Sequence, residues 1–316
     1  MADFSETGLV VEGGGTAVLG APTTMRGSEL RDFWKLLKPN VMQLVIFTSA
    51  VALFLAPGHV HPLLGFTAML CIALGAAASA AINNWFDADI DRQMARTRLR
   101  PTATGRIDPA EALAVGITLA ILSVMLMSLA LNYVAGALLA FTIAFYVLVY
   151  TMWLKRRTPQ NIVIGGAAGA LPPVVAWAAV TGEVTLMPIL LFAIIFLWTP
   201  PHFWALALYR NGDYARVGVP MLPVVMGRRR TLAHILGYTV VLVAVSLLPT
   251  ALGAAGPVYG VLALGLGSTF LRHAVRLWRE DRDVLAMRTF RFSIVYLFAL
   301  FAGLVVDRVA TDLVIG

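Results

Sequence analysis

Long apolar runs alternate with short polar segments along most of the chain. A helix that crosses a hydrocarbon core of about 30 Å needs about 20 mostly apolar residues, and the chain supplies nine such runs. We expect spans near residues 40–57, 62–86, 109–131, 133–153, 160–181, 185–209, 231–252, 254–275 and 292–313. The pattern predicts an all-α polytopic membrane protein with nine transmembrane helices around a central cavity.

Composition and charge agree with this class and give it an orientation. With 59% hydrophobic residues and a mean hydropathy of +0.81, the chain is too apolar for a soluble domain. Every Lys and Arg except Arg308 lies at the N-terminus or after an even-numbered span. The positive-inside rule therefore predicts a cytoplasmic N-terminus and a periplasmic C-terminus.

The net charge of +7 is spread over short loops between apolar spans. This distribution favours membrane lipid and an anionic substrate as partners, and it argues against nucleic acid. The single cysteine, Cys71, lies inside the second span, which excludes disulfides and thiolate metal sites.

The first 28 residues differ from the rest of the chain. Residues 1–28 are rich in Gly, Thr and Ala and contain no apolar run of signal-peptide length, so we expect a disordered tail before a single membrane domain at 29–316. Their only basic residue is Arg26, whereas a mitochondrial presequence is Arg-rich. A bacterial cytoplasmic (inner) membrane is therefore favoured.

An acidic cluster follows the second span. Asn83, Asp87 and Asp91 are spaced by four residues, so on a helix they drift only about 80° around the axis and form one polar stripe. Asp89 points to the opposite side, and we leave it out of the site.

Two acids at this spacing repel one another, and burial at a membrane boundary raises that cost. A divalent cation would offset the repulsion, and hard carboxylate oxygens suit Mg²⁺ that also binds a substrate phosphate. The alternative is a solvated helix end without a ligand.

Basic residues stand close to these acids. Arginine guanidinium groups match phosphate and carboxylate oxygens, so Arg96, Arg100, Lys38 and Lys155 are candidate substrate-binding residues. Each of them could instead be topogenic charge in contact with lipid. The combination of acids with cations is what a diphosphate leaving group would need.

A second loop, residues 210–230, lies on the same side as the loop at 87–108, and the two are expected to face each other over one cavity open to the cytoplasmic side. The diproline at 200–201 is expected to kink or restart the sixth helix. If that helix continues, His202, Tyr209 and Asp213 share one face. Asp213 would then complete the metal site, and Arg216 is a further candidate for an anion.

These residues resemble a known family. The pattern Asn83-x-x-x-Asp87-x-x-x-Asp91 is similar to the first acidic motif of UbiA-type intramembrane prenyltransferases, and the likeness covers the chain from about residue 30. Within that superfamily, two segments resemble the protohaem IX farnesyltransferases (haem O synthases). They are residues 150–166 and Trp198-Thr199-Pro200-Pro201-His202-Phe203-Trp204.

The resemblance implies a membrane enzyme that joins farnesyl diphosphate to haem B and uses Mg²⁺ bound by Asp87, Asp91 and Asp213, with Asn83 as a further ligand or orienting group. It also implies haem-processing enzymes or an assembly pathway for a terminal oxidase as further partners. His202 is expected to contact the haem and Arg216 a propionate. Many superfamily members have a paired second acidic motif, whereas this loop has Asp213 alone.

Aromatic rings near these segments are candidates to stabilise an allylic carbocation, namely Phe86, Trp204 and Tyr209. Two alternatives remain open. One is a related prenyltransferase with another acceptor, such as a quinone precursor or a chlorin. The other is a secondary transporter whose boundary acids couple cation binding to transport.

Overall fold

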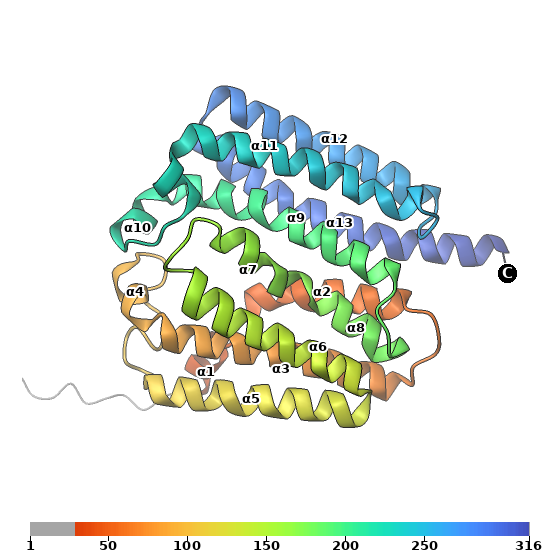
Figure 1. Ribbon diagram of the computed structural model, residues 1–316, viewed down its shortest axis with the longest axis horizontal. Coiled ribbons are helices and arrows are strands. Elements are labelled where there is room, and N and C mark those ends of the chain that lie inside the picture. Colours follow the sequence, from red (N-terminus) through yellow and green to blue (C-terminus); the bar gives the residue numbers. More distant parts are fainter. Residues whose placement is uncertain (1–28, 316) are drawn as a thin grey trace, which may run out of the picture.

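A computed structural model describes residues 29–315, and within this range every regular element is a helix. The expected tail at 1–28 lies outside the described residues. The long helices run roughly side by side, and the short helices α4 and α10 cap one end of the bundle (Figure 1). The helices are α1 (Leu30–Leu36), α2 (Pro39–Leu55), α3 (Pro62–Phe86), α4 (Ala88–Gln93), α5 (Pro109–Ala130), α6 (Tyr133–Ala144), the π-helix η1 (Phe145–Leu154), α7 (Asn161–Ala170), α8 (Pro172–Thr181), α9 (Leu186–Tyr209), α10 (Asn211–Arg216), α11 (Leu222–Ala251), α12 (Pro257–Glu280) and α13 (Asp283–Ile315).

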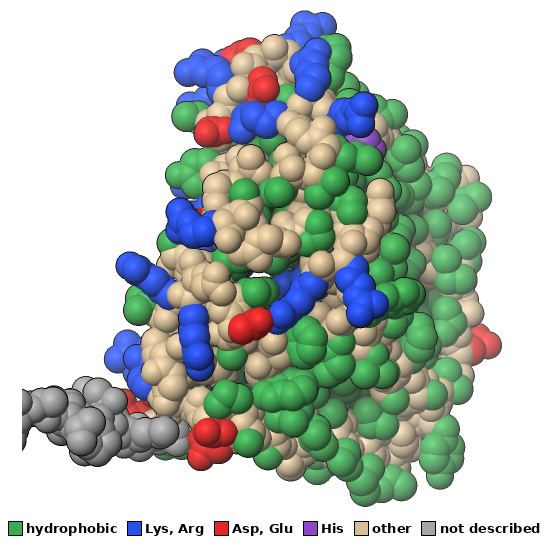
Figure 2. All heavy atoms as spheres, turned by 60° about the vertical axis from the view of Figure 1, so that its left-hand side comes forward, with side chains coloured by type: hydrophobic (Ala, Val, Ile, Leu, Met, Phe, Trp, Pro, Cys, Tyr) green, Lys and Arg blue, Asp and Glu red, His purple; other side chains and the backbone are tan. Residues whose placement is uncertain are grey.

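The expected membrane character is confirmed. In the described range, eight helical segments are long and apolar enough to cross a membrane, and Met42–Leu55 in α2 is a shorter apolar helix. The protein is therefore a multi-pass membrane protein, and a count of nine depends on α2 and stays a prediction. Large apolar side chains such as Phe66, Leu129 and Val261 are exposed on the outside of the bundle, as lipid-facing residues are. Figure 2 shows this apolar side next to the end of the molecule on which lysines and arginines gather.

Several helices are longer than the apolar runs that predicted them. The helix expected at 231–252 begins at Leu222, and the one expected at 292–313 begins at Asp283. Both added parts contain arginines, so their hydropathy is low. Hydropathy therefore predicts only the lipid-embedded part of each helix, and the helix continues beyond it. A break at Gly227, with φ 77°, lies within the added part of α11, just before its arginines.

Proline acts differently at two places. The run expected at 160–181 forms two helices, α7 and α8, and Pro172 occupies the first turn of α8, where its missing N–H costs nothing. By contrast, α9 continues through Pro200 and Pro201, so the restart expected there does not occur.

An apolar cavity of about 500 Å³ lies inside the bundle, bordered by residues of α2, α3, α6, η1, α7, α8, α9 and α13. Its wall includes Lys38 just before α2, Tyr146 and Tyr150 from η1, and His202 from α9. A cavity of this size and lining is typical of a site for a small apolar ligand.

Candidate functional site

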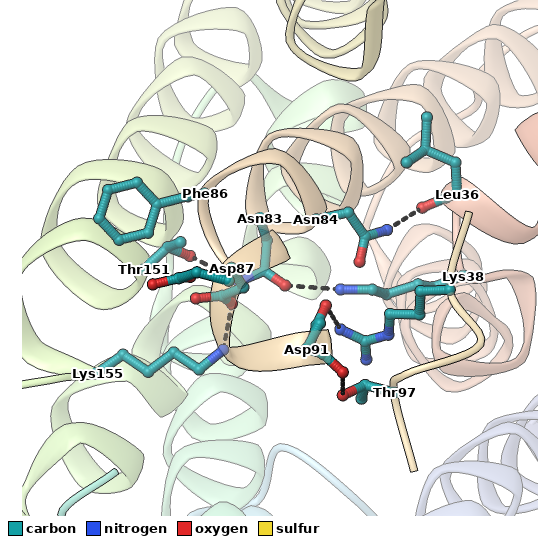
Figure 3. A network of polar contacts seen from close by, with 12 residues as sticks. Leu36, Lys38, Asn83, Asn84, Phe86, Asp87, Asp91, Thr97, Thr151 and Lys155 are labelled. Carbon is teal, nitrogen blue, oxygen red and sulfur yellow. Dashed lines mark hydrogen bonds and ion pairs between the residues drawn. The ribbon is translucent and has the colours of Figure 1, made fainter. Parts of the chain in front are cut away.

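The acidic stripe lies where α3 ends. Asp87 follows directly after the last residue of that helix, Phe86, and α4 begins at Ala88. The Asp87 N–H still donates to the Asn83 carbonyl, and the Asp91 N–H donates to the Asp87 carbonyl. The helical spacing therefore continues through the change of helix, and the three side chains are buried close together, with Asn83 bonded to Asp87 (Figure 3).

Asp87 is completely buried, and its partners come from α3 and from the segment that follows η1. Its Oδ2 accepts hydrogen bonds from Lys155 Nζ and, at 2.7 Å, from Asn83 Nδ2. Asn83 Nδ2 also lies 3.3 Å from Thr151 Oγ1. These contacts connect the end of α3 to η1 and to the segment that follows it.

Asp91 has a separate cationic partner. Arg100 Nη1 donates to Asp91 Oδ2 at 2.7 Å, and Thr97 Oγ1 donates to the Asp91 carbonyl at 3.0 Å. The loop after α4 thus folds back onto the acid that precedes it. The repulsion expected between Asp87 and Asp91 is offset by Lys155 and Arg100, so that repulsion alone does not require a metal ion.

Lys38 connects the polar network to the apolar cavity. Its Nζ donates to Asn83 Oδ1 at 2.6 Å, and the same side chain lines the cavity. The residue has a left-handed backbone, with φ 55° and ψ 55°, immediately before Pro39. Burial lowers the pKa of Lys38 well below its usual value, and the positive charges of Arg100 and Lys155 add to the shift.

Arg156 contacts the acidic cluster from its solvent side. Its guanidinium binds both carboxylate oxygens of Asp89, at 2.7 and 2.8 Å, and donates to the Phe86 carbonyl at 2.9 Å. One nitrogen lies 3.6 Å from Asp87 Oδ1. The hydrogen bonds from Arg156 lower the pKa of Asp89. Asp89 is exposed and points away from the stripe, as expected, but it positions a cation next to Asp87.

The donor set suits a divalent cation. Each acid uses Oδ2 for its shortest ion pair, and Asp87 Oδ1, with Arg156 at 3.6 Å, is buried without a hydrogen bond. A buried carboxylate oxygen left without a partner is costly, and it is also a ligand of the kind that Mg²⁺ prefers. Asp87 and Asp91 together therefore fit the usual arrangement of one or two carboxylates plus substrate phosphate.

The second loop does not join this network in the way the sequence suggested. Helix α9 ends at Tyr209 and α10 begins at Asn211, so His202 and Tyr209 lie on one helix and Asp213 on the next. Asp213 lies 3.9 Å from both Arg210 and Arg216 of its own segment. In the described part of the chain, no three His, Cys, Asp or Glu side chains form a group that could hold a metal ion. A third ligand from Asp213 stays a prediction.

The remaining candidates divide by burial. His202 is buried and lines the cavity, whereas Arg96, Tyr209 and Arg216 are exposed. The aromatic candidates are also placed differently from the expectation, since Phe86, Trp204 and Tyr209 do not line the cavity. Trp204 packs edge-on against Tyr238 of α11 with ring centroids 5.3 Å apart.

Two tyrosines occupy the place expected for those rings. Tyr146 and Tyr150 line the cavity next to each other, with centroids 5.2 Å apart. The ring of Tyr150 packs directly on Gly165, where a Cβ atom would collide with it. The sequence signalled these tyrosines only by their position, shortly before the cations that begin with Lys155.

Asn84 is a further residue that sequence reasoning missed. It is buried, and its Nδ2 donates at 2.8 Å to the Leu36 carbonyl at the end of α1. This bond ties the segment before Lys38 to α3. Its only signal in the sequence was its position next to Asn83 at the end of an apolar run.

Comparison with known proteins agrees with this geometry. The UbiA prenyltransferase family matches residues 44–301, which is most of the chain. The chain belongs to that family. A protein of Rhodopseudomonas palustris strain HaA2, named protoheme IX farnesyltransferase, is 60% identical over 283 residues, which cover 88% of this chain and 90% of the relative. A protein of the same name from Parvibaculum lavamentivorans is 57% identical, and the match covers 88% of this chain and 89% of that protein.

Solved structures share the fold of this UbiA-family chain. A digeranylgeranylglyceryl phosphate synthase superposes with a TM-score of 0.74 at 22% identity, covering 88% of this chain and 98% of the other. A UbiA homologue of Archaeoglobus fulgidus, solved with GPP and Mg²⁺, has a TM-score of 0.65 at 18% identity, covering 86% of this chain and 99% of the other. The all-helical intramembrane fold expected from the sequence is confirmed.

Proposed function

We propose that this protein transfers the farnesyl group of farnesyl diphosphate to a vinyl group of protohaem IX (haem B), with addition of water, giving haem O and diphosphate. The name shared by relatives at 57–60% identity supports this acceptor. One structural observation carries the site: Lys38 belongs both to the polar network at the end of α3 and to the wall of the apolar cavity. A diphosphate and its apolar tail need such a junction.

The diphosphate would bind among the cations of the network. Lys38, Lys155, Arg100 and Arg156 surround the acids, and such groups donate strong charge-assisted hydrogen bonds to phosphate oxygens. Mg²⁺ bound by Asp87 and Asp91 would supply further neutralisation of the leaving group. Lysine and arginine donors held by buried ion pairs stay in place as negative charge develops, which is where such donors lower a barrier.

The proposed reaction joins farnesyl to the vinyl group and then adds one molecule of water. The C–O bond between farnesyl C1 and the diphosphate breaks, and C1 forms a bond with the terminal carbon of the vinyl group. The inner vinyl carbon then carries the positive charge. A water oxygen adds to this carbon, and loss of one proton from that water leaves a hydroxyl group. The faces of Tyr146 and Tyr150 in the cavity wall would stabilise the cationic species, each by about 0.5–2 kcal/mol.

We also propose the bacterial inner membrane as the location, with the network on the cytoplasmic side, because nearly all Lys and Arg lie at that end of the spans. Haem O would then pass to haem-processing enzymes or to assembly of a terminal oxidase.

The test supplies farnesyl diphosphate and haem B to membranes that contain the protein or its Asp87→Asn variant. We expect haem O, identified by its mass, to form in equal amounts with diphosphate, and the variant to form neither at the same membrane level. Diphosphate release with a different prenylated product would indicate another acceptor. Transport of substrate without diphosphate release would overturn the enzyme assignment in favour of a transporter.

A further inference from the structure

The histidine in the cavity wall is held in an unusually fixed position. His202 is 8% exposed and lies between two aromatic faces, with Trp198 at 4.2 Å and Phe290 at 4.5 Å between ring centroids. The ring of Phe203 meets it edge-on at 5.1 Å. Because both faces of the imidazole are covered, only its edges can take part in further bonding.

One edge of the imidazole is occupied by Ser293. His202 Nδ1 lies 2.6 Å from Ser293 Oγ, and Ser293 Oγ lies 2.6 Å from the Phe290 carbonyl oxygen. Two oxygens at that separation repel unless a proton lies between them, so the one hydroxyl proton of Ser293 points to the Phe290 carbonyl. Ser293 is then an acceptor toward His202, and Nδ1 carries the ring proton.

This assignment decides the chemistry of the other nitrogen. With the proton on Nδ1, Nε2 has a free lone pair, and it accepts no hydrogen bond from the described part of the chain. A neutral imidazole whose Nδ1–H is hydrogen-bonded is the usual protein ligand of a haem iron. Most of the other residues in this wall are apolar, which suits a porphyrin face.

On the basis of the proposed function, we propose that His202 Nε2 binds the iron of the haem acceptor, and that Ser293 is a positioning residue that fixes the imidazole tautomer. The iron bond would anchor the porphyrin in the cavity and so limit which of its edges reaches the network around Asp87. The two vinyl groups of haem B differ in position alone, so an anchored iron provides a way to present one of them.

The test uses the full-length protein in lipid nanodiscs, titrated with ferric haem and followed by absorption and electron paramagnetic resonance. We expect a histidine-ligated spectrum for the natural protein. His202→Ala should lose that spectrum and bind haem about 10–100-fold more weakly, and added imidazole should restore the ligand signature. His273→Ala is the matched control, because His273 stacks on Phe292 at 4.9 Å but lies outside the cavity wall, and it should leave the spectrum unchanged.

Metal-free protoporphyrin IX separates iron binding from the shape of the cavity. His202→Ala should bind it as well as the natural protein does. Equal weakening for haem and for the metal-free porphyrin would show that His202 only shapes the wall, and an unchanged haem spectrum in His202→Ala would equally overturn the proposal.

Ser293→Ala tests the positioning role. Loss of the acceptor for Nδ1–H makes the imidazole a weaker donor, so the iron–histidine stretching frequency of the ferrous complex should fall. An unchanged frequency would contradict the role of Ser293. Histidine-ligated haem without any farnesyl transfer would refute the proposed function and leave this inference standing, whereas haem O formation with an unaltered spectrum in His202→Ala would do the reverse.

Discussion

The ends of α3 and α9 both place an aspartate among arginines at the same end of the bundle, yet the two ends differ. At α3 the acids are buried; Asp91 pairs at 2.7 Å with Arg100 of the following loop, and Asp87 pairs with Lys155 from a distant part of the chain. At α9 the acid Asp213 lies 3.9 Å from two arginines of its own short segment, and Arg216 is 64% exposed. Similar composition therefore gives one preorganised site and one solvated loop.

The difference comes from the partners that reach each acid. The i,i+4 hydrogen bonds continue into α4 through the Asp91 N–H, and they continue across Arg210 through the Tyr214 N–H, so the two helix ends have similar backbone bonding. Lys155 and Arg100 reach the buried acids after α3, whereas the ion-pair partners of Asp213 are Arg210 and Arg216 of its own segment. A buried ion pair also has far more effect on a reacting charge than an exposed one, because water screens the exposed pair.

The largest effect is expected from the acids. Asp87→Asn should lower farnesyl transfer by at least about 10²–10³-fold, since it removes a buried charge that organises the leaving-group site. Asp213→Asn should lower it by less than about tenfold. The measurement is haem O formed per amount of protein in membranes. Equal losses would break the comparison and would show that the loop of α10 contributes to the metal site.

The cations should follow the same order. Arg100→Met should lower transfer by about 10–100-fold, because its guanidinium holds Asp91 at the network. Arg216→Met is the matched change in the other loop and should alter the rate by less than about threefold. A steady-state series in farnesyl diphosphate measures both. A stronger effect of Arg216→Met would place the anion-binding surface on α10.

The contact of Tyr150 with Gly165 gives a smaller, local effect. In Gly165→Ala the added methyl group should displace the Tyr150 ring. We expect the free energy of unfolding to fall by about 1–3 kcal/mol and the rate of farnesyl transfer to decrease. Gly169→Ala is the control on the same helix and the same cavity wall, where an added methyl group meets nothing within 4 Å. Thermal unfolding in detergent measures the stabilities. Equal stability of the two variants would mean that Tyr150 moves without cost.

The smallest effect concerns pH. Arg156 lowers the pKa of Asp89, so the pair contributes its full stability above about pH 4 and loses it as the pH falls through the lowered pKa of Asp89. Since the Asp89 side chain is 60% exposed, the contribution is below about 1 kcal/mol. Asp89→Asn should therefore flatten the acid limb of the stability profile slightly, as measured by melting temperature from pH 6 to pH 3. A shift that persists at pH 7 and exceeds this size would show a larger role for Arg156 beside Asp87.

The sequence was a good guide wherever a regular helix connects the residues. Asn83, Asp87 and Asp91 could be placed on one side because helical spacing holds there, and the family and its prenyltransferase class are confirmed by the match over residues 44–301. Lys38 and Lys155 were plausible as charges, but their partners depend on contacts between helices far apart in sequence. Asp213 was expected to join the other acids, but its ion-pair partners are Arg210 and Arg216 of its own segment, and hydropathy gives no signal for such a local contact.

The π-helix η1 has a consequence for how this chain tolerates changes in length. Its hydrogen bonds reach back five residues, as in the bond from the Lys155 N–H to the Tyr150 carbonyl. Deleting one residue between Tyr146 and Leu154 would favour an ordinary α-helix and rotate everything after the deletion by about 100°. Lys155 would then turn away from Asp87, so this stretch of the gene should accept many substitutions on its lipid side and almost no insertions or deletions.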